Sequence, residues 1–574
     1  MQHPGHVRHL IVRGYGPLVA FVVFFAAMAA LAPTVSPDTD AAAAPGEEGQ
    51  TGTDSPGTGA GATGGQADTA DPGAASPEGD GAGQGEGGQA EAQATEEQDA
   101  GPQDDIAAGD DGQSQADGGD GALQPCEDRD LQVPGDPYSP PCVTFAGDNP
   151  GATHRGVTED EIVISARTPD EPGFLDELAN LADADIADSQ EDVRRTIAAL
   201  EEYFNERFEF YDRQLRFEFF DGQSTFQEEA QNRGHEEAQQ DALTAADDIG
   251  AFAELTGATE PYASALAQEG VISVSGIHFP RGYYEQHAPL KWSTFTDCST
   301  VVEAAAEWTV QRLFHRQAEF AGDPEFRERE RDVVAIGPEN PIYQACVVDA
   351  ERVYDEHGEN IPDLINYTLD ISTMSNQAAN IVAQLQNRGV TTVQAFVDPV
   401  MAVFLTARAT EQDYFPEWII SGAAYMDQDV LGQLQHPEQW QHAMGVSFAG
   451  EDLPQQATLG YHAYRQVRDD EPAFAVDAIY QAMYLLAIGI QGAGPDLTPA
   501  TFQQGMSDYP GGTGPYGTWH FGTSNHTATQ DFREIYWDPD EISDFNNEPG
   551  AWVETDPGVR LERGEIPEGP PRLP

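Results

Sequence analysis

The chain has 574 residues, with 27 Lys and Arg against 99 Asp and Glu, and therefore a formal net charge of -72. This charge opposes binding to nucleic acid or to an anionic membrane surface, because both carry negative charge themselves. Four cysteines are too few for a disulfide-built scaffold, although their even number permits two disulfides. Composition also varies along the chain, so its length does not translate directly into several equal domains.

Residues 1–35 predict a membrane anchor. Arg8 and Arg13 precede a stretch without charge from Gly14 to Val35. A bilayer core requires about 20 apolar residues in a helix, and Arg on the N-terminal side favours the cytoplasm for that end. The rest of the chain would then be exported. A cleaved signal peptide is the alternative, because the small residues over 27–32 resemble cleavage sites, and cleavage would leave the protein secreted.

Residues 36–125 predict a disordered acidic linker rich in Gly and Ala. The segment contains no aromatic residue and no Lys or Arg, but many Asp and Glu. Such a composition cannot bury enough apolar surface to offset the entropy of the chain. We expect it to act as a tether between the anchor and a folded head.

The folded part begins with a short extension over 126–155. Cys126 and Cys142 flank a turn rich in Pro and Gly, and in an exported chain this arrangement favours a disulfide that closes a loop. A metal site is the alternative, but no His or Cys pair with ligand spacing accompanies the two cysteines.

From Gly156 onward, β-rich runs alternate with amphipathic helical stretches, which is typical of α/β architecture with parallel sheets. The expected strands are 161–166, 215–220, 250–255, 271–275, 333–336, 362–367, 392–397 and 418–421. The expected helices are 190–207, 226–246, 259–268, 300–317, 341–357, 375–388, 399–410, 453–466 and 474–492, with a hairpin near 517–538. The pattern therefore predicts two similar α/β halves in tandem.

No pattern for covalent, nucleotide or metal chemistry is present. The sequence contains no Gly-x-Ser-x-Gly elbow, phosphate-binding loop, His-Glu-x-x-His or Cys-x-x-Cys. We therefore expect a protein that is not an enzyme and that holds no metal and no cofactor.

Three stretches resemble one family. Gly156 to Ser165 is similar to its opening strand after a Gly-Val-Thr turn, Ala253 to Gly276 to its ligand loop and following strand, and Thr513 to Trp537 to its closing hairpin. In this order, over 156–540, they resemble the type 1 periplasmic binding proteins. Within these, the likeness is to the leucine, isoleucine and valine class of solute receptors for ABC importers.

The resemblance implies two Rossmann-like lobes that are joined by a hinge of several strands and close on a small ligand. Lobe 1 is expected to comprise 156–294 and 422–510, and lobe 2 to comprise 295–421 and 511–540. A C-terminal tail follows over 541–574.

Ligand contacts are expected where parallel strands end and helices begin, because free N–H groups there attract anions. The resemblance places ligand residues of lobe 1 at Thr256, Gly257, Ala258, Thr259 and Ser275. Thr hydroxyls and backbone N–H groups could hold a carboxylate there. A helix N-cap at Thr256 or Thr259 is an equally open interpretation.

From lobe 2, the resemblance implies ligand contacts at Glu339, Tyr343 and Asp398, which would supply an aromatic wall and an acid that pairs with a ligand ammonium. Asp398 precedes Pro399, so an N-cap followed by Pro at the first helical position is an alternative role. Glu254 departs from the family pattern, which has a small residue or Pro at this position.

Cys298 and Cys346 fall near the cleft side of lobe 2, and we expect a second disulfide between them, with two free buried thiols as the alternative. The sequence thus predicts a membrane-tethered receptor that binds a small polar molecule, an amino acid being one candidate, and delivers it to an ABC permease. A ligand sensor or interaction protein of the same fold without transport is the second hypothesis.

Overall fold

The computed structural model describes residues 123–168, 188–276, 278–450 and 452–573. The predicted anchor over 1–35 and almost all of the predicted linker over 36–125 lie outside these residues. Within the described ranges, no helix combines the length and the apolar character that crossing a bilayer requires.

The N-terminal extension is a small hairpin fixed by a disulfide. β1 (Leu123–Pro125) pairs antiparallel with β2 (Val143–Phe145), and the predicted disulfide between Cys126 and Cys142 is confirmed. The last 3 residues of the predicted linker are therefore a strand, since the disulfide holds them beside β2.

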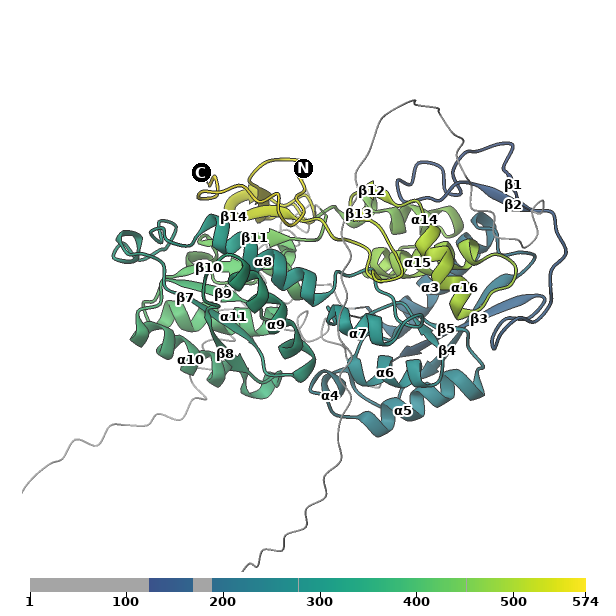
Figure 1. Ribbon diagram of the computed structural model, residues 1–574, viewed down its shortest axis with the longest axis horizontal. Coiled ribbons are helices and arrows are strands. Elements are labelled where there is room, and N and C mark those ends of the chain that lie inside the picture. Colours follow the sequence, from purple (N-terminus) through teal and green to yellow (C-terminus); the bar gives the residue numbers. More distant parts are fainter. Residues whose placement is uncertain (1–122, 169–187, 277, 451, 574) are drawn as a thin grey trace, which may run out of the picture. The chain divides into compact units, whose positions relative to one another are not determined.

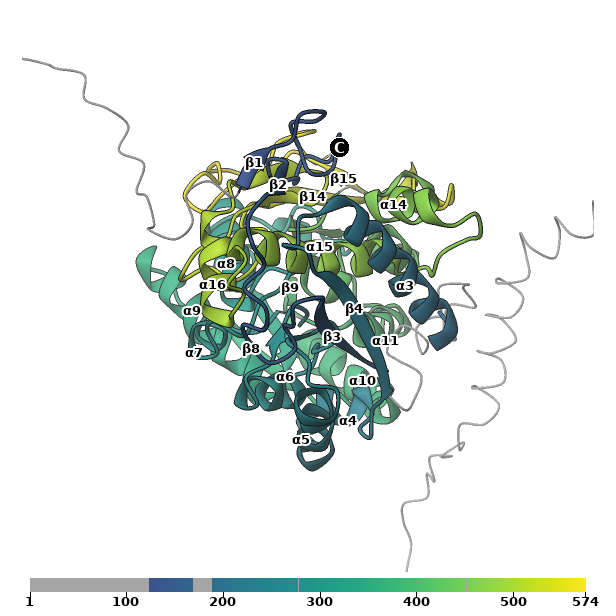
Figure 2. The same ribbon diagram turned by 90° about the vertical axis from the view of Figure 1, so that its right-hand side faces the viewer.

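Lobe 1, as we define it, is a four-stranded sheet with the helices that pack on it. The strand order is β4-β3-β5-β6 and all neighbouring strands are parallel. The strands are β3 (Glu161–Thr168), β4 (Gln214–Asp221), β5 (Ala253–Glu254) and β6 (Ile272–Ser273). The helices are α3 (Gln190–Arg207), α4 (Phe226–Ala230), α5 (His235–Leu243), α6 (Glu260–Gln268), α7 (Arg281–Gln286), α14 (Leu459–Val467), α15 (Val476–Ala493) and α16 (Pro499–Asp508). Helices α3, α14 and α15 pack against one another (Figure 2).

The helix predicted over 226–246 is wrong as a single element. α4 ends at Ala230, and α5 begins only at His235. Asn232 and Gly234 between them have φ angles of 58° and 69°, a left-handed conformation that no helix interior contains. After α5, the chain continues as one π-helical turn over Thr244–Asp248.

Lobe 2 is a seven-stranded mixed sheet with its own helices. The strand order is β15-β14-β11-β10-β9-β7-β8, in which β14 and β15 run antiparallel to their neighbours. The strands are β7 (Val333–Pro338), β8 (Asp363–Tyr367), β9 (Thr392–Ala395), β10 (Glu417–Ile420), β11 (Ala443–Ser447), β14 (Arg533–Ile542) and β15 (Pro549–Glu554). The helices are α8 (Cys298–Arg312), α9 (Pro341–Glu356), α10 (Ile371–Arg388), α11 (Pro399–Glu411), α12 (Asp429–Gly432) and α13 (Pro437–Trp440). In Figure 1, each sheet lies among the helices of its own lobe, and the α/β class is confirmed.

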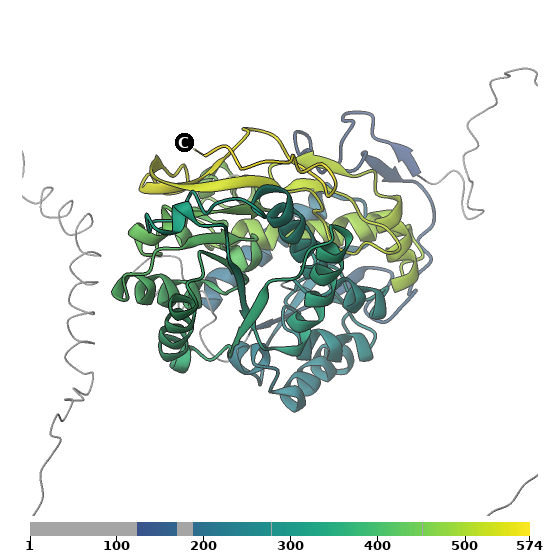
Figure 3. The ribbon, with the colours of Figure 1, turned by 60° about the vertical axis from the view of Figure 1, so that its left-hand side comes forward.

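The membership of three segments differs from the predicted lobe boundaries. β11 follows residue 422 yet pairs with β10 of lobe 2. The predicted C-terminal tail contributes β15, seen in yellow at the edge of lobe 2 in Figure 3. Instead of forming a hairpin with β14, β13 (Gly517–Trp519) pairs with β12 (Gly512–Gly514). Burial explains the last difference, because Trp519 lies in the hydrophobic core of lobe 1.

The chain passes between the lobes along three connections, from α7 to α8, from β11 to α14 and from β13 to β14. Each lobe keeps its own core: Phe204 and Leu485 are fully buried in lobe 1, and Val393 and Leu405 are fully buried in lobe 2. Two separate cores that are joined by three connecting segments are compatible with movement of one lobe against the other.

Candidate functional site

A cavity of about 280 Å³, which we call the apolar pocket, lies where lobe 1 faces the carboxyl ends of the lobe 2 strands. Lobe 2 supplies most of its wall from β7, β8, α8 and α9, and lobe 1 supplies α4 and His278. Small side chains leave this space open: Ala306 on α8, Ala335 and Gly337 on β7, and Ala350 on α9. A larger side chain at any of these positions would fill it.

Asp398, which follows β9, lines the apolar pocket. One oxygen, Oδ1, accepts hydrogen bonds from the N–H groups of Val400 at 3.0 Å and Met401 at 3.1 Å. The other, Oδ2, accepts from the Tyr367 hydroxyl at 2.7 Å. The N-cap role is therefore confirmed, while a ligand contact at Asp398 stays a prediction. Burial raises the pKa of Asp398, despite these donors.

Tyr343 on α9 also lines the apolar pocket, so the structure brings it together with Asp398 as predicted. Burial and the nearby charge of Asp398 raise the pKa of Tyr343 to about 12, so its hydroxyl stays protonated at neutral pH. Glu339 is not among the residues that line the pocket. Its carboxylate accepts a hydrogen bond from the Thr368 hydroxyl at 2.8 Å.

The predicted ligand residues of lobe 1 lie outside the wall of the apolar pocket. The Thr256 hydroxyl accepts from the Arg167 N–H at 3.0 Å and donates to the Glu254 carboxylate at 2.6 Å. The Thr259 hydroxyl donates to the buried carboxylate of Glu229. Both hydroxyls are therefore used within the protein. Thr259 is the N-cap residue of α6 by backbone geometry, but its side chain accepts no capping hydrogen bond from the described N–H groups of the first turn.

The rest of this loop surrounds Lys291, the only lysine in the sequence. Its ammonium group donates to the carbonyl of Gly257 at 3.0 Å, to the Ser273 hydroxyl at 2.9 Å and to the carbonyl of Ser275. Ala258 lies in the same turn, and its N–H donates to the Thr256 carbonyl at 2.7 Å. The Ser275 hydroxyl, in contrast, is buried without a hydrogen-bond partner.

Glu254 has a structural role in this loop that sequence reasoning missed, although its departure from the family pattern was a signal. Its carboxylate is fully buried at the end of β5. It accepts hydrogen bonds from the N–H groups of Arg167 and Thr256, each at 3.0 Å, and from the hydroxyls of Ser165 and Thr256. The anion-binding place of lobe 1 thus contains the protein's own anion.

A second cavity of about 360 Å³, which we call the acidic pocket, lies on the hinge side between the lobes. Asp427, Asp452 and Asp477 line it together with the aromatic residues Phe295, Tyr425, Phe448, Phe474, Tyr516 and Phe545. Burial raises the pKa of Asp427 and, together with the charge of Asp429, raises that of Asp452 well above its usual value. Sequence reasoning did not find this cavity, because its residues come from distant segments.

His278 lines both pockets. Its Nδ1 lies 2.8 Å from the carbonyl oxygen of Thr296, so that nitrogen carries the proton and donates. Burial lowers the pKa of His278, which favours the neutral ring at neutral pH. The His278 side chain therefore contributes a polar but uncharged ring to the wall of both pockets.

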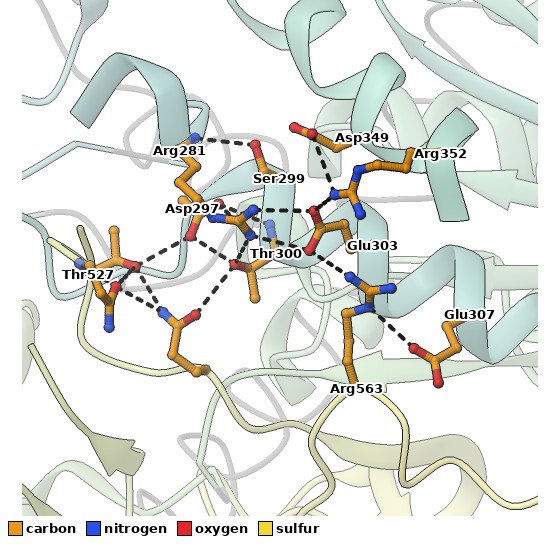
Figure 4. Close-up of polar contacts among 12 residues, drawn as sticks. Arg281, Asp297, Ser299, Thr300, Glu303, Glu307, Asp349, Arg352, Thr527 and Arg563 are labelled. Atoms are coloured by element: carbon orange, nitrogen blue, oxygen red, sulfur yellow. Dashed lines mark hydrogen bonds and ion pairs between the residues drawn. The ribbon is translucent and has the colours of Figure 1, made fainter. Parts of the chain in front are cut away.

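Polar contacts join the lobes beside the apolar pocket. Arg281 on α7 of lobe 1 donates to Glu303 at 3.2 Å and to the Thr300 hydroxyl at 3.0 Å on α8 of lobe 2 (Figure 4). The Asn340 side chain of lobe 2 donates to the carbonyl of Ala230, a residue of lobe 1 that lines the pocket, at 2.8 Å. The predicted disulfide between Cys298 and Cys346 is confirmed, and both cysteines line the pocket.

Among the residues that the structure describes, no group of three or more His, Cys, Asp or Glu side chains could hold a metal ion. The predictions that the protein has no cofactor and is not an enzyme stay predictions.

Comparison with known proteins identifies relatives of this architecture. Residues 183–541 match the family model described as periplasmic binding protein. A solute-binding protein of an ABC transporter from R. palustris, solved in complex with 4-hydroxybenzoate, is 11% identical. That match covers 70% of this chain and 97% of the other chain, with a TM-score of 0.50. At this identity the likeness concerns the fold alone.

Two further solved structures are similar. A fatty acid ABC transporter substrate-binding protein from Thermomonospora curvata is 16% identical, over 74% of this chain and 99% of its own, with a TM-score of 0.49. A possible leucine/isoleucine/valine-binding protein from Rhodopirellula baltica SH 1 is 9% identical, over 69% and 96%, with a TM-score of 0.48. No curated protein sequence matches the chain.

Proposed function

Since the chain belongs to the periplasmic binding protein family, we propose that it is an extracytoplasmic receptor that captures a small molecule between its lobes and delivers it to an ABC importer. The observation that carries this proposal is the apolar pocket, whose wall combines α4 and His278 of lobe 1 with the strand ends of lobe 2. A ligand in this pocket would contact both lobes and favour their closed arrangement.

We place the apolar body of the ligand among the small side chains of lobe 2, with its polar group near Asp398 and Tyr343. Ser275 remains a proposed contact from lobe 1, because its hydroxyl has no hydrogen-bond partner among the described residues. For Thr256, Gly257, Ala258 and Thr259 we propose a supporting role, since their polar groups hold the loop in shape. This wall differs from the polar site expected of an amino-acid receptor.

We further propose that residues 1–35 anchor the receptor in the cell membrane, or direct its secretion if they are cleaved, and that residues 36–122 tether the folded head. The support is compositional, because the first segment is long and uncharged and the second is acidic and free of aromatic residues. Mass analysis of the protein from cells would distinguish retention from cleavage.

The proposal is tested by thermal-shift screening of the full chain against alkyl and aryl amines, alcohols and carboxylates, amino acids and sugars. Aromatic acids belong in the panel because the R. palustris structure contains 4-hydroxybenzoate. We expect at least one class to raise the melting temperature. Absence of any shift at about millimolar ligand, corresponding to about −4 kcal/mol or weaker binding, would contradict the receptor role for these classes.

A matched pair of variants locates the binding. Val347 lines the apolar pocket, whereas its neighbour Val348 is 66% exposed. Val347→Trp should abolish the ligand-induced shift by filling the cavity, and Val348→Trp should leave it unchanged. Loss of the shift in both variants, or in neither, would show that the ligand binds elsewhere.

A further inference from the structure

We infer that the ligand is an apolar molecule that carries an ammonium group and no carboxylate. This inference rests on the proposed function and names the ligand class of the same site. It separates this receptor from binders of amino acids and of aromatic or fatty acids, since all of these ligands carry a carboxylate.

The first argument is that the anion-binding place of lobe 1 is already filled. At the carboxyl end of β5, backbone N–H groups and hydroxyls point toward one place, as they would toward a ligand carboxylate. Glu254 occupies that place with a fully buried carboxylate and takes the N–H groups of Arg167 and Thr256 as well as the Thr256 hydroxyl. A ligand carboxylate would find these donors used and a negative charge beside it.

The second argument is the sign of the charges that line the cavities. The described residues lining the apolar pocket include one acid, Asp398, and no Lys or Arg. Those lining the acidic pocket include Asp427, Asp452 and Asp477, again without Lys or Arg. Neither lining therefore supplies a cation to pair with an anion, and an anion would meet repulsion from any of these acids that is ionised.

The short stretches within the folded part that the structure does not describe add no positive charge to the lining of the two pockets. Residues 169–187, Ile277 and Glu451 contain no Lys or Arg, although residues 169–187 contain several Asp and Glu. These stretches therefore add no cation that could pair with a ligand carboxylate.

The third argument concerns two buried cations of lobe 1, Lys291 and Arg167. The Lys291 ammonium is held by the carbonyl of Gly257 and the Ser273 hydroxyl. Arg167 pairs with Glu229 at 2.7 Å and with Asp241 at 3.0 Å. Recruiting either to a ligand carboxylate would leave their present partners unsatisfied in the interior, which costs more than the new contact returns.

The lining also offers what an ammonium group requires. In the apolar pocket, the carboxylate of Asp398 lies beside the aromatic residues Tyr343, Tyr367 and Phe396. An ammonium placed there would pair with the acid and could contact ring faces, while the alkyl or aryl body would lie among Ala306, Ala335 and Ala350. Neutral His278 would add no repulsion.

The inference is tested by calorimetry with ligands matched in all but the polar group. 2-Phenylethylammonium, 2-phenylethanol and 3-phenylpropanoate form one series, and hexylammonium, hexanol and heptanoate form the other. With the full chain, we expect each ammonium to bind about tenfold or more tightly than its carboxylate and its alcohol. Equal or tighter binding of either a carboxylate or an alcohol overturns the inference.

Variants then locate the charge that is recognised. Asp398→Asn should weaken the ammonium about tenfold and the alcohol less than about twofold. Asp363→Asn is the matched control, since that acid lies on the surface of lobe 2 with a 73% exposed side chain and should change neither. An equal loss for ammonium and alcohol in Asp398→Asn would overturn the inference.

Failure of this inference differs from failure of the proposed function. If the ammonium ligands do not bind while another class in the thermal-shift panel does, the inference is wrong and the receptor role stands. If no class binds, the receptor role itself is contradicted, and the ligand class falls with it.

Discussion

The two lobes differ in what occupies the space at the carboxyl ends of their parallel strands. In lobe 1, charged side chains fill the space: Glu254 takes the donors after β5, and Arg167 at the end of β3 pairs with Glu229 and Asp241. In lobe 2, small side chains leave the space open, and Asp398 is the acid that faces it. In lobe 1 the carboxylates of Glu254, Glu229 and Asp241 are paired within the protein, whereas in lobe 2 a cavity remains.

This difference suggests separate roles for the lobes: lobe 1 supports the site, and lobe 2 selects the ligand. A network whose polar groups are all satisfied is rigid, because any displacement leaves a buried charge without a partner. Lobe 1 is thus suited to act as a fixed wall. A cavity lined by small apolar side chains can instead accept a ligand body, so that lobe 2 would determine what fits.

The largest expected effect comes from breaking the ion pairs of lobe 1. Arg167→Met should lower the free energy of unfolding by about 4 kcal/mol, because Glu229 and Asp241 would remain buried without their cation. Urea denaturation measures the change. The control is Arg388→Met, which removes a surface pair with Asp363 and should cost about 1 kcal/mol or less. Similar losses in both variants would mean that lobe 1 does not depend on its buried charges.

Opening the disulfide in the wall of the apolar pocket comes next. Replacing Cys298 and Cys346 by Ala should cost about 4 kcal/mol, since the unfolded chain regains the freedom of a loop with a sequence separation of 48. Replacing Cys126 and Cys142, separated by 16, should cost about 1 kcal/mol less, because loop entropy grows slowly with length. The reverse order in denaturant titrations would contradict this account.

Emptying the anion-binding place of lobe 1 tests whether Glu254 fills it. Glu254→Ala should cost about 2 kcal/mol, because the Thr256 N–H loses its acceptor and the Arg167 N–H keeps only the Thr256 hydroxyl. Added acetate should restore part of the melting temperature in this variant. Neither the native chain nor Glu206→Ala, which removes an exposed acid of α3, should respond. An acetate effect of equal size in all three would indicate a nonspecific salt effect.

The smallest expected effect is a change in pH dependence at Lys291. Burial lowers the pKa of Lys291 to about 7, whereas an exposed lysine in the unfolded chain titrates near about 10.4. Between these values the unfolded chain holds a proton that the folded chain lacks, so stability is lost as the pH falls toward the folded pKa. Relative to Lys291→Met, the native chain should gain up to about 1.4 kcal/mol between about pH 7.5 and 8.5. Parallel pH profiles would instead show that the three oxygen acceptors keep the ammonium charged.

Sequence reasoning reached most of the helices and strands because their apolar periodicity is local. α3 and α11 coincide with predicted helices within a residue, and β7 to β10 lie where β-rich runs were expected. It failed where the pattern gave no local sign. The break between α4 and α5 depends on the backbone at Asn232 and Gly234, and the position of β13 depends on the burial of Trp519 in lobe 1.

For the candidate site, the motif order pointed to strand ends in both lobes but not to the use of each side chain there. Tyr343 and Asp398 line a cavity as expected, whereas the hydroxyls of Thr256 and Thr259 are used inside the protein. Hydrogen-bond partners cannot be deduced from residue type alone, since a hydroxyl serves a ligand and a buried carboxylate equally well.

The sequence by itself determined the acidic charge, the α/β class and the family resemblance, because composition and periodicity are properties of the chain. The tertiary structure alone decided that Glu254 occupies the donors of lobe 1, and that small side chains from α8, α9 and β7 enclose a cavity beside Asp398. Both features depend on which distant segments of the chain come together. A buried charge or a cavity affects stability only in the folded structure, where those segments surround it.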